Sequence, residues 1–351
     1  MQHKHSTTTT GRTYGRDSTV CPVCAGTVHT SIRPVFDDRY GCPDMFSLVR
    51  CDVCGHLMTS PALAEEELAS LYSTYYPRKH VNTADLVASA SEVAGPRARL
   101  QRWWGGTSNQ GQYTVSPGQV MLDVGCGSGL SLLEAQALGA EAYGIEADPN
   151  VRRIADELKL RVYIGSLHDR PFQDVSFDLI VLNQVIEHIP DPGKALEALK
   201  ERLKPMGRLV LVLPNRGSLW QRLSGAKWIN WHVPYHLHHF DAKGFRAFAQ
   251  RHGYRVIRQK TITPNIWTIL QLRALRESPV PGVPSAMWEV KPAAEVAPSA
   301  QASPPAPNPG RLMRKLVRQT AFSSLALFNR LVDLVGQGDS ILVELQIERS
   351  A

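Results

Sequence analysis

The sequence predicts an α/β protein in which a Rossmann-like, mainly parallel sheet follows a small metal-binding module. Three observations support this fold class. Between residues 118 and 263, short apolar runs alternate with amphipathic stretches, as in parallel sheets covered by helices. The first apolar run ends in a glycine-rich turn, Asp123-Val124-Gly125-Cys126-Gly127-Ser128-Gly129. Two CxxC pairs precede this region, at Cys21/Cys24 and at Cys51/Cys54.

The alternating region divides into individual elements by its apolar spacing and by its Gly and Pro positions. We expect strands at 120–124, 142–146, 161–164, 177–182, 208–213 and 254–261. We expect helices at 130–138, 150–158 and 193–203, the last of them stopped by Lys204-Pro205-Met206-Gly207. A final alternating run, 340–348, predicts a strand that returns to the sheet after an insertion.

The whole chain is predicted to contain five parts. They are a disordered polar tail (1–18), a zinc-ribbon-like module (19–76), a connector (77–117) that is helical over 81–104, the main domain (118–263, completed by 338–351), and an insertion (264–337). Within the insertion, a Pro- and Ala-rich linker (278–310) has too few apolar residues to order itself. An amphipathic helix is expected at 311–335.

The bulk composition restricts the class of protein. With 351 residues, of which 43% are hydrophobic and 20% charged, the chain can form a sizeable core. No apolar run reaches the roughly 20 residues that cross a bilayer, and the polar N-terminus lacks a secretory segment, so we expect a cytoplasmic protein. The formal charge of +7 suits an anionic partner such as a nucleotide-sugar, a phospholipid or RNA, but a solvated surface has the same composition.

The glycine-rich turn has the chemistry of a nucleotide-binding site. Glycines at 125, 127 and 129 let the backbone turn tightly and let a ligand approach, and the following helix presents unpaired N–H groups. Glu146 ends the next strand, about 20 residues later, where a carboxylate can accept hydrogen bonds from both hydroxyls of a ribose. NAD and S-adenosylmethionine (SAM) both carry this ribose, so these residues alone do not separate the two cofactors.

Further motifs follow the turn in a specific order. They are Tyr143-Gly144-Ile145-Glu146, Phe177-Asp178-Leu179-Ile180, Val185-Ile186-Glu187-His188-Ile189-Pro190-Asp191-Pro192 and Leu203-Lys204-Pro205-Met206-Gly207. With these motifs the chain from Met121 to Asn215 resembles the class I SAM-dependent methyltransferases, particularly the group that includes ubiquinone-type O-methyltransferases. The resemblance implies SAM as methyl donor and a seven-stranded sheet with one antiparallel strand, which fits the run 340–348.

The same resemblance implies a set of SAM-binding residues. The turn contributes Asp123 and Cys126, and its glycines, Gly125, Gly127 and Gly129, line the methionine portion of SAM. Glu146 holds the ribose, Ser166 and Leu167 flank the adenine, and Asn183 and Gln184 face the sulfonium and the substrate. Some ubiquinone-type enzymes have an acid near position 184 that helps to bind a divalent metal. The neutral amide of Gln184 is a poor metal ligand, which argues against a catalytic magnesium ion.

The segment 228–240 is rich in histidines and aromatic residues and is the predicted acceptor side of the site. Histidine titrates near neutral pH, and a base is needed when the methyl acceptor must lose a proton. The four histidines could equally bind a metal, lie on the surface or be satisfied in the core, and their crowded spacing fits neither face of a regular strand or helix. We single out His236, because its surroundings resemble a segment of related methyltransferases. In sugar C-methyltransferases the histidine follows a glutamate, whereas here it follows Tyr235, whose hydroxyl could orient a substrate.

The two CxxC pairs match a structural zinc ribbon. Each pair places two thiolates on one tight turn, and two turns complete a tetrahedral Cys₄ site for Zn²⁺ from Cys21, Cys24, Cys51 and Cys54. All four positions are filled by protein, so this zinc is structural; reduced free thiols are the alternative. Cys42 is expected to be a spare thiol or a neighbour of the site.

A zinc module before a SAM domain also resembles sugar C-methyltransferases. The tyrosine-rich run Leu71-Tyr72-Ser73-Thr74-Tyr75-Tyr76 resembles a segment that those enzymes place near the substrate, although an aromatic core helix has the same pattern. One group of ribosomal RNA guanine methyltransferases shares the architecture, so the architecture does not decide the substrate.

The helix expected at 311–335 is basic in its first turns and apolar later. It could lie on a membrane surface near a lipid-linked acceptor, or pack on the main domain or on a second subunit. The sequence predicts no oligomeric state.

The leading functional hypothesis is a methyltransferase that acts on a small or glycan-type acceptor by in-line displacement, with His236 as the general base. A nucleotide-linked or lipid-linked sugar is one such acceptor. The first alternative is an RNA methyltransferase whose zinc module holds the nucleic acid. Arg33, Arg39 and Arg50 are too sparse for such a surface, so we do not expect a nucleic-acid partner. The second alternative is a non-catalytic zinc-ribbon interaction protein on a SAM-fold scaffold.

Overall fold

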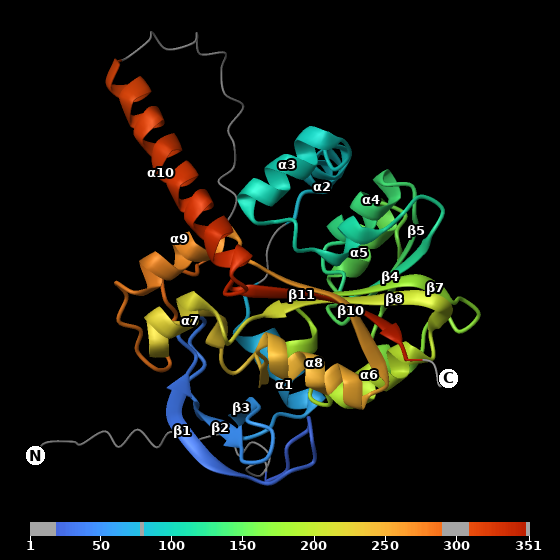
Figure 1. Cartoon of the computed structure of the whole chain (residues 1–351), viewed down its shortest axis with the longest axis horizontal. Coiled ribbons are helices and arrows are strands. Elements are labelled where there is room, and N and C mark those ends of the chain that lie inside the picture. Colours follow the sequence, from blue (N-terminus) through green and yellow to red (C-terminus); the bar gives the residue numbers. More distant parts are fainter. Residues whose placement is uncertain (1–18, 78–80, 290–308, 349–351) are drawn as a thin grey trace, which may run out of the picture.

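The computed structural model describes residues 19–77, 81–289 and 309–348, and the tail expected at 1–18 lies outside them. A seven-stranded sheet crosses the middle of the protein, with α4, α5 and the connector helices on one side and α6 and α8 on the other (Figure 1). Its strand order is β10-β11-β8-β7-β4-β5-β6. The strands are β4 (Val120–Val124), β5 (Glu141–Glu146), β6 (Arg161–Ile164), β7 (Phe177–Asn183), β8 (Leu203–Pro214), β10 (Tyr254–Ile262) and β11 (Ser340–Ile347).

The sheet confirms the predicted fold class. Strands β4, β5, β6, β7 and β8 pair in parallel, whereas β11 is antiparallel to both β8 and β10. All seven predicted strands are present, and the late strand β11 inserts between β8 and β10 as the resemblance implied. The sheet is buried on both faces, because two separate apolar clusters lie against it.

Three helices on the sheet are close to their predicted bounds: α4 (Leu130–Ala137), α5 (Val151–Glu157) and α6 (Pro192–Lys200). A fourth, α8 (Ala242–Arg251), lies where no helix is predicted. The prediction of a helix at 193–203 extends too far, because α6 ends at Lys200. Leu203 is already the first residue of β8, where it pairs with Phe177 of β7. The run 204–207 is therefore an irregular part of a strand, and regular pairing resumes at Arg208.

A second, four-stranded sheet holds the N-terminal cysteine module, in the order β1-β2-β3-β9. Its first strands are β1 (Val28–Phe36), β2 (Met45–Cys51) and β3 (Leu57–Ser60). The fourth, β9 (His238–His239), comes from the histidine-rich segment and pairs with β3. The expectation that these histidines fit no regular strand is therefore wrong for two of them. Helix α1 (Glu65–Thr74) follows the sheet.

The connector contains two helices in place of the single one expected at 81–104. They are α2 (Thr83–Ser91) and α3 (Pro96–Gly105). Gly95 separates them with a φ of 103°, which is accessible mainly to glycine, and Pro96 starts the second helix. A short 3₁₀ helix, η1 (Gly111–Thr114), leads into β4.

Three helices lie outside the main sheet and its layers: α7 (Leu219–Ser224), α9 (Asn265–Ala274) and α10 (Pro309–Leu334). Helix α10 matches the expected amphipathic helix and projects beyond the rest of the protein (Figure 1). Within the parts of the chain described above, no helix is both long and apolar enough to span a bilayer.

The linker expected at 278–310 differs from its prediction in its first part. Residues 278–289 pack on the cysteine module, where the Ser285 N–H donates to the Arg39 carbonyl at 2.8 Å. The Arg39 guanidinium also stacks on the Trp288 ring at 4.0 Å from its centroid. These contacts, rather than apolar content of its own, order the segment; residues 290–308 lie outside the described chain.

Candidate functional site

The glycine-rich turn connects the carboxyl end of β4 to α4. Gly125, Gly127 and Gly129 have φ values of 74°, 53° and 81°, which ordinary residues rarely adopt. A Cβ on Gly125 would lie 2.5 Å from Val185, and one on Gly129 would lie 2.5 Å from Leu160. At Gly127 a Cβ would meet nothing within 4 Å, so the turn leaves open space on that side.

Glu146, at the end of β5, lies directly beside this turn. Its carboxylate accepts the Gly127 N–H at 2.8 Å and the Asp148 N–H at 2.9 Å. The two backbone donors fix the carboxylate at the turn. The structure therefore brings together the glycines and the acid that the sequence singled out for SAM.

Two other turn residues lie deeper. The buried Asp123 accepts a hydrogen bond from the Ser131 hydroxyl, and burial raises the pKa of its carboxyl to about 7. The Cys126 thiol is buried in the apolar cluster on one face of the sheet, against Leu132 and Gly144. Only the backbone of Cys126 is therefore available to a ligand.

The residues predicted to flank the adenine follow β6 in a short 3₁₀ helix, η2 (Leu167–Asp169). The Ser166 side chain accepts the His168 N–H at 3.2 Å, and Leu167 is buried. Ser166 therefore starts this short helix, and its hydroxyl oxygen caps the helix as an acceptor.

The residues predicted to face the sulfonium end β7. The Asn183 amide accepts the Gly111 N–H at 2.8 Å and donates to the Gln112 side chain at 3.0 Å, so it holds η1 against the strand. Gln184 has a φ of 57°, a conformation uncommon outside glycine, and its N–H donates to the Val212 carbonyl. No local pattern points to Gly111 and Gln112, because they lie about 70 residues before their partner in the chain.

The four histidines of the segment 228–240 are all buried. His238 and His239 are satisfied core residues. His238 Nε2 lies 3.1 Å from the Ile189 carbonyl and its Nδ1 lies 3.2 Å from His56, while His239 lies 3.3 Å from the Thr59 hydroxyl. Thr59 in turn donates to the His236 carbonyl at 2.7 Å, which ties β3 to this segment.

His236 is held in one tautomer. Its Nδ1 lies 2.9 Å from the Asn230 carbonyl, which can only accept, so Nδ1 carries the proton and Nε2 has a free lone pair. Burial lowers its pKa well below the usual value, and His188 adds to this effect. At neutral pH His236 is therefore an uncharged imidazole that can accept a proton at Nε2.

Glu187 is the residue that the sequence interpretation left without a role. It lies in η3 (Ile186–His188), directly after β7, and one ligand atom each of Glu187, His188 and His236 lies within 4.8 Å of the others. Its carboxyl is fully buried, and neither oxygen has a hydrogen-bond partner among the described residues. Burial raises its pKa to about 8. An acid inside the apolar run 185–189 is the sequence signal that could have identified it.

Tyrosines surround this group. The Tyr72 hydroxyl lies 3.0 Å from His188 Nδ1, and the Tyr235 carbonyl lies 2.8 Å from the same atom. The Tyr235 ring contacts those of Tyr40, Tyr72 and Tyr76 at centroid distances of 5.0–5.8 Å, and its hydroxyl is buried without a partner among the described residues. Tyr235 and the tyrosine-rich run thus form an aromatic cluster that also borders the His188 and His232 rings.

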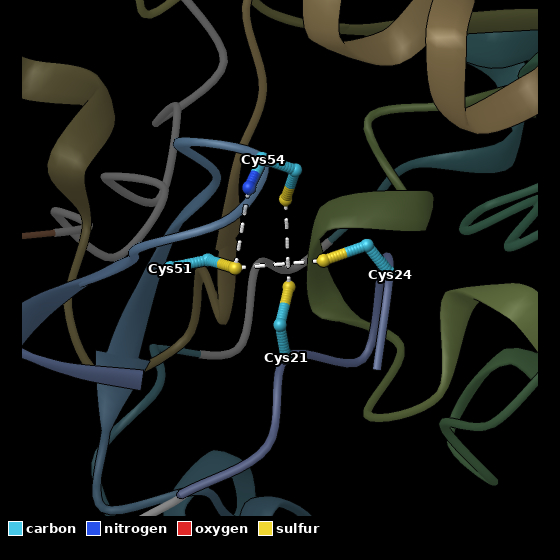
Figure 2. A group of neighbouring side chains, drawn as sticks. All are labelled: Cys21, Cys24, Cys51 and Cys54. Atoms are coloured by element: carbon cyan, nitrogen blue, oxygen red, sulfur yellow. Dashed lines mark hydrogen bonds between the residues drawn. The ribbon is translucent and has the colours of Figure 1, made fainter. Parts of the chain in front are cut away.

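The four predicted zinc ligands converge. Figure 2 shows the thiols of Cys21, Cys24, Cys51 and Cys54 pointing toward one another from two turns. The sulfurs of Cys21 and Cys54 are 3.8 Å apart, those of Cys24 and Cys51 are 3.5 Å apart, and all four lie within 4.8 Å of one another. Cys42 is buried elsewhere in the module, with its thiol 3.6 Å from Asp44.

A family model described as a methyltransferase domain matches residues 96–259. The chain is 26% identical over 185 residues to the ubiquinone biosynthesis O-methyltransferase of Albidiferax ferrireducens, covering 45% of this chain and 72% of that protein. It is 35% identical over 134 residues to the one from Xanthomonas campestris pv. campestris, covering 35% and 56%. A 37.1 kDa protein in transposon TN4556 of Streptomyces fradiae is 32% identical over 111 residues, and the chain spans only 32% of its length and 29% of its own.

The solved structures that the chain matches are more distant in sequence. The putative sarcosine dimethylglycine methyltransferase of Galdieria sulphuraria is 15% identical, with a TM-score of 0.42 over 72% of this chain and 87% of that one. The cyclopropane synthase of Mycobacterium tuberculosis is 16% identical, with a TM-score of 0.41 over 71% and 84%.

The raised pKa of Glu187 predicts how a substitution changes stability with pH. Between its ordinary pKa of 4.5 and about 8, the folded protein holds a proton that the unfolded chain has lost. The stability from this group is therefore complete below 4.5 and is lost as the pH rises to about 8. The measured quantity is the free energy of unfolding of Glu187→Gln minus that of the unmodified chain. We expect this difference to increase by up to about 1.4 kcal/mol for each pH unit. Urea denaturation across this range measures the difference.

Glu92→Gln, which exchanges an exposed acid for an amide, is the matched control and measures the effect of the exchange itself. A difference for Glu187→Gln that does not change with pH would mean that Glu187 is ionised in the folded protein.

Proposed function

We propose that this chain, which belongs to the class I SAM-dependent methyltransferases through residues 96–259, methylates a small or glycan-type acceptor with His236 as general base. The observation that carries the proposal is the combination of two half-sites at the carboxyl edge of the sheet. One is the turn 123–129 with Glu146, and the other is the buried group formed by Glu187, His188 and His236. Val185, in the segment between β7 and η3, touches the turn and links the two half-sites.

The residues of the first half-site fit SAM. The open space at Gly127 admits a ligand that any side chain there would obstruct, and Glu146 is fixed where ribose hydroxyls can donate to it. Ser166 and Leu167 would border the adenine, and Gln184 would lie toward the sulfonium. When bound, SAM supplies an activated methyl group, so the protein's task is to align the acceptor and to remove its proton.

The residues of the second half-site fit that task. His236 Nε2 takes the proton from the acceptor atom as the bond from this atom to the methyl carbon forms. SAM, when bound, would supply this methyl carbon, and the electron pair of its carbon–sulfur bond would remain on sulfur. The Asn230 carbonyl stabilises the resulting imidazolium through the Nδ1–H. Glu187, as a neutral acid, offers one O–H donor to the acceptor, because none of the described residues occupies it.

The surroundings of His236 support a polar, ring-shaped acceptor such as a sugar. Aromatic faces of Tyr40, Tyr72, Tyr76 and Tyr235 gather beside buried polar atoms without partners, namely the Glu187 carboxyl, the Tyr235 hydroxyl and His232 Nε2. An apolar wall with a few unpaired polar groups is typical of small-molecule sites. Tyr235 would contact the acceptor and orient it.

The RNA alternative gains no support from the module. Arg39 stacks on Trp288 and donates to the Ile229 carbonyl, and Arg33 lies 4.8 Å from the Trp231 ring centroid. Both arginines are therefore used inside the protein rather than in a surface stripe.

We also propose that the four clustered cysteines bind a structural Zn²⁺. Backbone N–H groups of Val23, Gly26 and Cys54 point at the Cys21, Cys24 and Cys51 sulfurs at 3.4–3.5 Å, an arrangement that stabilises thiolates. Four protein ligands leave no open position, so the ion would hold the module rather than act on a substrate. The module in turn supports β9, next to His236 in the chain.

For His236→Ala we expect SAM affinity within about twofold of the unmodified chain and turnover reduced by roughly 10²–10⁴-fold, since only proton removal is lost. Calorimetry measures SAM binding, and mass spectrometry of products from labelled SAM and pools of candidate acceptors measures transfer. His252→Ala, at the end of α8, is the control. Full turnover by His236→Ala would remove this residue from the mechanism, and absence of SAM affinity in the unmodified chain would favour a non-catalytic scaffold.

For Glu146→Ala we expect SAM affinity to fall by roughly tenfold to a hundredfold, the usual effect of losing hydrogen bonds to a charged group. Calorimetry with SAM is the measurement, and Asp156→Ala, an exposed acid on α5, is the control. Equal affinity of Glu146→Ala and the control would mean that Glu146 does not contact the ribose.

For zinc, elemental analysis of the purified chain is expected to find one ion per molecule. Cys51→Ser should lose the ion and unfold at lower temperature, because the module depends on it. Cys42→Ser should keep the ion, since this thiol lies outside the cluster. Retention of zinc by the Cys51 variant would contradict the assignment.

A further inference from the structure

Helix α9 is amphipathic in the reverse sense of an ordinary surface helix. It buries Asn265, Thr268 and Gln271, which follow one another at three-residue spacing on a single face. It exposes Ile266, at 53%, and Leu272, and Leu275 directly after its last residue is exposed as well. In a water-soluble helix the apolar stripe faces the core and the polar side faces solvent.

Helix α10 shows the same reversal in its second half. Asn329 and Arg330 are buried, together with the small Ala326 and with Val332. The opposite side exposes apolar residues along one stripe, including Leu331 at 55% and Leu334 at 81%, together with Leu327 and Phe328. Val317 extends this stripe toward the start of the helix, and Val335 follows directly after its end. We call these residues, together with Ile266, Leu272 and Leu275, the apolar surface.

Polar bonds fix the two helices in this orientation. The Asn329 amide donates to the Asn265 side chain and to the Thr268 hydroxyl, both at 3.0 Å. Arg330 forms an ion pair with Asp333 at 2.8 Å, and the Thr263 hydroxyl donates to Asp333 at 2.8 Å. Rotating α10 to bury its leucines would leave these groups without partners, so the apolar surface is a fixed feature of the fold.

The charges near the apolar surface indicate what kind of partner covers it. The sequence from 296 to 332 has no acidic residue, and Arg311, Arg314, Lys315 and Arg318 fall in the first turns of α10. Arg314, Arg318, Arg273 and Arg276 are exposed. A parallel pair of α10 helices from two copies would bring like charges together, and an antiparallel pair would set cations against leucines. An anionic lipid surface suits both features, because it takes apolar side chains and attracts cations.

We propose that α9 and α10 form a membrane-docking surface that lies in the interface of an anionic phospholipid bilayer. Polar groups paired between helices, with apolar side chains outward, form the arrangement that a lipid environment favours. Neither helix is long and apolar enough to cross the bilayer, so the helices lie along it, with α10 as the projecting element (Figure 1). The inference goes beyond methyl transfer and does not depend on it.

The test is co-sedimentation of the full chain with vesicles of phosphatidylcholine alone or mixed with phosphatidylglycerol. We expect binding to the anionic vesicles. The double variant Leu331→Asp/Leu334→Asp should bind the anionic vesicles more weakly, by about tenfold at least. The reason is that charged side chains replace two leucines that would insert into the bilayer. Arg314→Gln/Arg318→Gln should weaken binding to the anionic vesicles by about tenfold and leave the weak binding to phosphatidylcholine unchanged.

Met206→Asp changes an apolar residue that is equally exposed but lies at the start of β8, and it should bind like the unmodified chain. Circular dichroism shows whether each variant folds. Absence of vesicle binding by the unmodified chain would overturn the proposal, as would equal loss in the Met206 control. Light scattering shows whether the unmodified chain is a dimer. If it is a dimer that does not bind vesicles, and Leu331→Asp/Leu334→Asp is a monomer, the apolar surface would bind a second copy instead.

Discussion

The buried carboxylate of Asp339 fixes the segment on which the candidate active site depends. It lies just before β11 and accepts hydrogen bonds from the Ser218 hydroxyl at 2.6 Å, the Trp228 indole at 2.9 Å and the Asn230 amide at 3.2 Å. Asn230 in turn presents its carbonyl to His236. Three partners offset the cost of burying this acid, and together they hold 228–230 in the conformation that sets the tautomer of the candidate base.

The same segment joins the two sheets. Its end forms β9 beside β3, and the Leu237 N–H donates to the Glu187 carbonyl at 2.8 Å. His56, which follows the second cysteine turn, contacts His238. The cysteine module is therefore joined through β3 and His56 to the segment that carries His236, and order in the module supports the backbone around this histidine.

Sequence reasoning succeeded where the signal is local. Alternating apolar runs predicted all seven strands of the main sheet, and the spacing of the two CxxC pairs predicted a cluster that the structure forms. It failed where partners are distant in the chain. The residues around His238 do not predict its pairing with β3, and those around Ser285 do not predict its contact with Arg39. Asn183 and Gly111 are likewise brought together only by the tertiary fold. Glu187 was visible as a motif, but its lack of partners is a property of three-dimensional burial.

The sequence of an amphipathic helix also does not determine which of its two sides faces the rest of the protein. The periodicity of α10 shows that its two sides differ, and the hydrophobic effect normally assigns the apolar side to the core. Here Asn329 of α10 forms hydrogen bonds with Asn265 and Thr268 of α9. Water could replace these hydrogen bonds only if the two helices separated. Each bond contributes modestly on its own, about 1 kcal/mol. Leaving several leucines in water costs more than that, so the arrangement is favourable when an apolar phase covers them. The anionic bilayer proposed for the apolar surface would be such a phase.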